Sequence, residues 1–132
     1  MTLAFWCVLA ALLAPYFLSV AARSAVPRAD YVGDPRSYSD SLSGWRRRAH
    51  LAHLNAFEAV PAIVAGVMVA EFAQAPRGTV DALALAFVGF RLLHAVFYLT
   101  DKPMWRSHAW RFGMLCVIGL FVVAAVQGQA SP

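Results

Sequence analysis

The sequence predicts an all-α fold, an integral membrane bundle of four helices in a single domain. Apolar residues make up 61% of the 132 residues and charged residues only 14%, against roughly 45–50% and about 25% in soluble domains. A globular domain of this length buries only about two-thirds of its chain surface, which is too little to hide so many apolar side chains. The apolar residues also fall into four runs, each near the ~20 residues that cross a bilayer as a helix.

The first run, residues 3–22, carries no charge and is long enough to cross ~30 Å of hydrocarbon. Pro15 within it is tolerable in a membrane helix. A cleaved signal peptide is the alternative, because Ser19, Val20 and Ala21 resemble a small-residue cleavage site. However, no positive charge precedes the run, and it is longer than the usual apolar core of about 7–15 residues. We therefore predict a retained helix.

Three more spans are expected after a polar loop over residues 23–48. Thr79 is the expected N-cap of the third span, because a threonine oxygen can accept a hydrogen bond from the free N–H groups of the first turn. Asp81 lies in that turn, and Glu71 precedes the short second loop; both carboxylates are expected to be solvated. The predicted bounds of these spans are residues 49–73, 80–100 and 109–126.

Cations are concentrated between the apolar runs rather than in a stripe that would suit nucleic acid, which we exclude as a partner. By the positive-inside rule, the first and third loops face the cytoplasm and both termini lie outside. The predominance of arginine indicates a bacterial chain, hence an inner-membrane location. The second loop holds Arg77 alone, whereas the other two hold Arg23, Arg28, Arg36, Arg46, Arg47 and Arg48, and then Lys102, Arg106 and, just beyond, Arg111.

Two spans carry ionisable residues near their middle, where a charge costs about 2.5–3.5 kcal/mol and usually faces a partner. Asn55 and Glu58 share one helical face at a spacing of three. Arg91, His94 and Tyr98 share another at i, i+3 and i+7. Glu58 and Arg91 lie at similar depth, so we predict that they approach each other, in one subunit or across a subunit boundary. A buried ion pair that only sets helix register is the alternative, but a whole polar stripe favours an anion site.

The remaining candidates for chemistry are histidines and cysteines. His50 and His53 are three apart but do not point where Asn55 points, so we expect no metal site. Cys7 and Cys116 lie inside apolar runs and are expected to pack in the core.

These residues resemble the signature of the MAPEG family, the membrane-associated proteins in eicosanoid and glutathione metabolism. The family's second-helix signature is matched in this chain by the run Arg48-Ala49-His50-Leu51-Ala52-His53-Leu54-Asn55-Ala56-Phe57-Glu58, followed by Pro61. The third-helix pattern resembles Arg91, His94 and Tyr98, continued by Arg106 and Ser107. The resemblance covers nearly the whole chain.

The resemblance implies a homotrimer that binds glutathione in clefts between neighbours, near the cytoplasmic face. It implies that Asn55, Glu58, Arg91 and Tyr98 bind glutathione and that His94 matches a position that is histidine in prostaglandin E synthases. It also implies that Arg106 stabilises the glutathione thiolate, with Ser107 beside it.

The chain departs from the family at two positions before the asparagine, where well-studied members have arginines and this chain has Leu51 and Leu54. The spacing from Tyr98 to Arg106 is also one residue shorter than in prostaglandin E synthases. Arg48 is the candidate that compensates for the lost anion ligands.

The resulting hypothesis is a glutathione-dependent transferase or peroxidase that acts on lipophilic electrophiles. The first alternative, motivated by the two leucines, is a non-catalytic membrane scaffold or lipid-binding protein. A small multidrug exporter is a third reading, because it also has four spans and an embedded glutamate. Such an exporter usually carries its glutamate in the first span, which is uncharged here.

Overall fold

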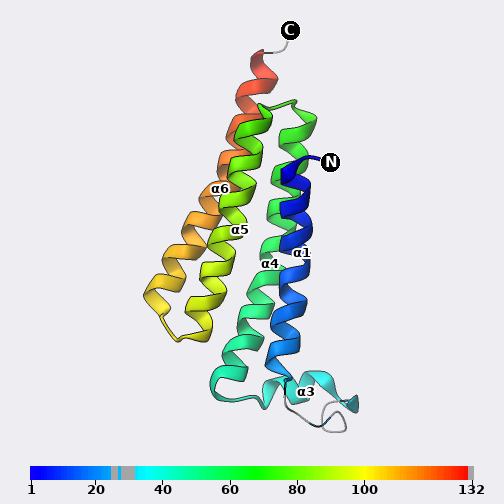
Figure 1. Cartoon of the computed structure of the whole chain (residues 1–132), viewed down its shortest axis with the longest axis vertical. Helices are drawn as coiled ribbons and strands as arrows, with labels where there is room; N and C mark the ends of the chain where they lie inside the picture. The colour runs from blue at the N-terminus through cyan, green and yellow to red at the C-terminus, as the bar shows by residue number, and fades with distance from the viewer. Residues whose placement is uncertain (25–26, 28–31, 131–132) are drawn as a thin grey trace.

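The computed structural model describes residues 1–24, 27 and 32–130, and these form an all-helical chain (Figure 1). Four of the helices are long and apolar enough to cross a membrane. The predicted four-helix membrane bundle is therefore confirmed. The elements are α1 (Leu3–Ala22), α3 (Pro35–Asp40), α4 (Gly44–Phe72), α5 (Arg77–Leu99) and α6 (Pro103–Ala130).

The long helices run side by side with alternating direction, and α1 packs closely on α4 while α5 packs closely on α6 (Figure 1). The short helix α3 and the connection between α5 and α6 lie at one end of the bundle, which we name the α3 end. The connection between α4 and α5 lies at the opposite end, with both chain termini toward it. The two cation-rich loops therefore share one end. Arg28 lies outside the described residues.

Three helices begin earlier than the sequence suggested, and one of them is α5, which begins at Arg77 rather than at residue 80. The helix α4 begins at Gly44 rather than at residue 49, and Gly44 has a φ of +58°, which glycine adopts without the usual steric cost. The helix α6 begins at Pro103 rather than at residue 109, because the fixed φ of proline suits the first helical position. Most of the expected third loop is thus helical.

The core consists largely of small apolar side chains from all four long helices. Cys7 and Cys116 are buried there as free thiols. Close approach is visible at Gly66, where an added Cβ would lie 3.1 Å from Leu120 Cδ1, and at Gly119, where it would lie 3.2 Å from Leu83 Cδ2. Small residues that bring backbones together are typical of helix contacts within membranes, where packing replaces the hydrophobic effect.

The start of α1 is held by carboxylates of other helices, which corrects the expectation that these groups are solvated. The backbone N–H of Ala4 donates to Asp81 Oδ1 at 2.7 Å, and Thr2 Oγ1 donates to Glu71 Oε1 at 3.0 Å. The prediction of Thr79 as an N-cap was wrong, since α5 begins at Arg77 and Thr79 already lies inside it. Asp81 instead caps a different helix, across the bundle.

We expect Asp81→Ala to lower the free energy of unfolding by about 1–2 kcal/mol, because it removes a charged acceptor from a helix N-terminus. Thr79→Ala is the matched control and should change it by less than about 0.5 kcal/mol, since Thr79 makes no side-chain cap bond. Denaturant unfolding in detergent, followed by circular dichroism, measures both. Equal effects of the two substitutions would contradict the assigned cap.

Candidate functional site

A hydrogen-bonded chain of polar side chains joins α4 to α5, from half-buried Arg91 to exposed Glu58. Arg91 Nη2 donates to the backbone oxygen of Asn55 at 2.9 Å and to Asn55 Oδ1 at 2.9 Å. Asn55 Nδ2 in turn donates to Glu58 Oε2 at 3.4 Å. The predicted approach of Glu58 and Arg91 is thus mediated by Asn55, because the shorter amide side chain lies between the two charged ends.

Beside this chain lies a cavity of about 350 Å³, which we name the polar pocket. It is formed by one residue of α4 and by residues near the adjoining ends of α5 and α6, so it lies toward the α3 end. Both its charged and its neutral groups can hydrogen-bond to a ligand. The pocket is lined by Asn55, His94, Tyr98, Arg106, Ser107, Trp110 and Arg111.

Arg106 is positioned in the pocket by an aromatic ring. Its guanidinium carbon lies 4.3 Å from the centroid of Tyr98, within the range of a cation–π contact. The Tyr98 ring is met edge-on by His94, which is 4% exposed, at 5.5 Å between centroids. Ser107 Oγ donates to the carbonyl of Pro103 at 3.0 Å, which leaves the oxygen of the hydroxyl able to accept a hydrogen bond.

The remaining predicted site residues lie outside the lining of the polar pocket. Arg48 Nε donates to the backbone oxygen of Leu99 at 3.2 Å, so it satisfies a carbonyl at the end of α5. Glu58 is exposed on the surface of the chain and is joined to the pocket through Asn55. His53, which was not a predicted site residue, contacts the backbone oxygen of Pro15 through Nδ1 at 2.7 Å and so connects α4 to α1.

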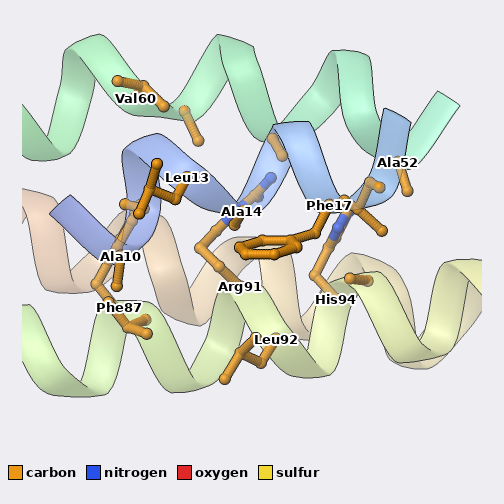
Figure 2. A pocket seen from close by; sticks show the side chains of 16 residues that line it. Ala10, Leu13, Ala14, Phe17, Ala52, Val60, Phe87, Arg91, Leu92 and His94 are labelled. Carbon is orange, nitrogen blue, oxygen red and sulfur yellow. The ribbon is translucent and has the colours of Figure 1, made fainter. Parts of the chain in front are cut away.

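A second cavity, of about 580 Å³, lies between α1, α4 and α5, and we name it the apolar cavity. Its walls are mostly alanine, leucine, valine and phenylalanine side chains, and Arg91 and His94 are the ionisable residues among them. His94 lines both cavities. A polar and an apolar compartment thus share a wall. The side chains that line the apolar cavity come from all three helices, as Figure 2 shows for Ala10, Phe17, Ala52, Val60, Phe87 and His94.

Two residues of the polar pocket, Trp110 and Arg111, were not among the predicted site residues. Arg111 was interpreted only as an orientation signal, because it lies just beyond the third loop, near the start of the predicted fourth span at residue 109. The available signal was its spacing of four from Ser107, which places both residues on one helical face if the helix already includes Ser107.

The family model described as MAPEG family matches residues 3–126, a range that contains every residue lining the two cavities. No curated protein matches the chain.

We expect Asn55→Ala to lower the free energy of unfolding by about 1–3 kcal/mol, because the half-buried Arg91 guanidinium loses a side-chain acceptor inside the bundle. Glu58→Gln is the control, since its amide oxygen can still accept from Asn55 and its side chain is exposed; it should cost less than about 0.5 kcal/mol. Unfolding in detergent by added denaturant measures both. A larger loss for Glu58→Gln would show that the carboxylate, not the amide, holds Arg91.

Proposed function

Since the chain belongs to the MAPEG family, we propose that it is a glutathione-dependent transferase or peroxidase acting on lipophilic electrophiles in the membrane. Membership of the family makes it an integral membrane protein of glutathione and eicosanoid metabolism. The observation that carries the proposal is the pair of cavities that share His94, one polar and containing arginine, the other apolar.

The polar pocket offers groups that complement glutathione, which has two carboxylates, one ammonium and a thiol. Arg106 supplies a cation, and Asn55, Tyr98 and Ser107 supply neutral hydrogen-bonding groups. Arg91 and Glu58 stand behind Asn55 and add a cation and an anion at one side of the pocket. Arg48 lies near the cytoplasmic end, where it would attract anionic ligands.

Glutathione supplies the nucleophile in such a reaction, and Arg106 is the residue that activates it. A free thiol has a pKa near 8.5 and is mostly protonated at neutral pH. A guanidinium beside the sulfur favours the thiolate and lowers its pKa. Arg106 is held over the Tyr98 ring at 4.3 Å, so its charge is already fixed in the pocket before a ligand arrives. Ser107, the next residue, can accept a hydrogen bond from the ligand through its hydroxyl oxygen.

The apolar cavity accounts for the lipophilic substrate class. A compartment of about 580 Å³ lies within the usual ~300–1,000 Å³ of small-molecule sites. Leu13, Phe17 and Leu92 of its lining are also exposed on the protomer surface, so an apolar molecule can enter from the surrounding acyl chains. His94 is then the side chain between the two substrates.

We further propose that the protein is a homotrimer in a bacterial inner membrane, with the α3 end in the cytoplasm. Glu58 is exposed on a membrane-spanning helix, next to Leu54 at 44% and Phe57 at 38% exposure. A carboxylate facing lipid is unfavourable, so a neighbouring copy is the expected cover. The orientation follows from the cation-rich loops at the α3 end.

A non-catalytic scaffold or lipid-binding protein is the second candidate, and Leu51 and Leu54 favour it. In this case the trimer would form, but glutathione would leave its melting temperature unchanged. A lipid in the apolar cavity would be the natural ligand of such a protein.

We expect the purified protein in detergent to bind glutathione as the thiolate at neutral pH and to conjugate a chlorinated nitroaromatic. Arg106→Ala should retain binding within about threefold but lose the thiolate absorbance at pH 7, because the pKa of the bound thiol returns toward ~8.5. Turnover at pH 7 should fall roughly tenfold or more and recover as the pH rises, since the thiol then ionises without Arg106.

Arg77→Ala is the control, because Arg77 begins α5 at the end of the bundle far from the polar pocket; it should behave as wild type. The absence of glutathione binding at millimolar concentration would reject the proposed function. An unchanged thiolate signal in Arg106→Ala would reject only the role of Arg106.

A further inference from the structure

Arg111 is a charged residue inside a membrane-spanning helix that the proposed function leaves without a role. It lies eight residues after Pro103, the first residue of α6, hence roughly 12 Å along the helix at 1.5 Å per residue. Arg91 lies eight residues before Leu99, the last residue of α5, so the two guanidinium groups start from similar depths. An arginine at such a depth normally faces a partner or a water-filled cavity rather than lipid.

The cavity that Arg111 faces is the polar pocket, whose lining it shares with Ser107 and Trp110 of the same helix. Ser107 precedes it by four residues and so lies on the same helical face. The helix α6 therefore presents a serine, a tryptophan and an arginine to the pocket, whereas α4 contributes only Asn55 and no cation.

The other arginines near the pocket are already engaged. Arg91 donates twice to Asn55, and Arg106 lies on the Tyr98 ring. Arg111, by contrast, forms no hydrogen bond, ion pair or ring contact with any residue in the part of the chain that the structure describes. All the N–H donors of its planar guanidinium are therefore available, and two of them can bind one carboxylate through a pair of parallel hydrogen bonds.

We infer that Arg111 binds the glycyl carboxylate of glutathione, an inference that rests on the proposed function. The ammonium at the γ-glutamyl end needs an anion, and Glu58, joined to the pocket through Asn55, supplies it on the α4 side. Arg91 on that side uses only Nη2 for its bonds to Asn55, so its other donors suit the neighbouring α-carboxylate. The glycyl end then points toward α6, where Arg111 lies, and the thiol lies between the two ends near Arg106.

The test compares glutathione with its glycyl monoethyl ester, which lacks this one negative charge. Binding to the full-length protein in detergent is measured by calorimetry. Wild type should bind glutathione roughly tenfold more tightly than the ester, because a charge-assisted bidentate bond is lost with the ester. Arg111→Gln should bind both ligands with the affinity that wild type has for the ester, so the preference disappears.

Arg77→Gln is the matched control and should keep the wild-type preference, since it removes the same charge at the opposite end of α5. If Arg111→Gln aggregates on gel filtration, Arg111→Lys decides the matter. Lysine keeps the positive charge but cannot form the paired hydrogen bonds of a guanidinium, so the preference for glutathione over the ester should fall to roughly threefold.

The outcomes separate the two hypotheses. If wild type binds no glutathione, the proposed function fails. If wild type binds glutathione but does not distinguish it from the ester, or if the Arg111 variants keep the full preference, the role of Arg111 is overturned while the proposed function stands.

Discussion

The rest of the site depends on one constraint, that the Arg91 charge must be satisfied within the protein because lipid cannot solvate it. Its two hydrogen bonds to Asn55, one to the backbone and one to the side chain, meet this need and fix α5 against α4. Once that contact is set, His94 and Tyr98 follow on the next turns of α5 along the same face. The polar pocket is thus a consequence of how a buried charge is accommodated, and the same contact makes Arg91 part of the wall of the apolar cavity.

Most of the fold could be predicted because its determinants are properties of whole segments. Four apolar runs require four spans whatever their detailed packing, and a spacing of i, i+3 and i+7 places Arg91, His94 and Tyr98 on one face in any helix. Asn55, Tyr98 and Arg106 do meet at one pocket. The role of Asn55 between the two charged residues could not be predicted, because it depends on side-chain reach within a fraction of an ångström rather than on spacing along the chain.

The errors arose at helix ends, where a few residues decide the structure. The cap expected from Thr79 failed because α5 already begins at Arg77, after Pro76. Asp81 was expected to be solvated, but it accepts a hydrogen bond from the N–H of Ala4. This contact could not be predicted from a local pattern, because the two residues are 77 positions apart in sequence. The role of Arg111 was missed for a related reason, because Ser107 was expected in the loop before the fourth span. Since Pro103 starts α6 early, Ser107 is helical and shares a face with Arg111, and both line the pocket.

The distribution of charges explains why the pocket is asymmetric. On the α4 side the charges are linked to one another through Asn55, so they hold each other in place and can orient a ligand without moving. On the α6 side Arg106 is held by a ring and Arg111 is held by nothing in the described residues. Side chains that are already held in place lose little conformational entropy when a ligand binds. A side chain without contacts, such as Arg111, loses more, but it can change its conformation to fit the ligand. Under the proposed function, such a combination would suit a flexible tripeptide, because one end could be held by the fixed groups and the other by Arg111.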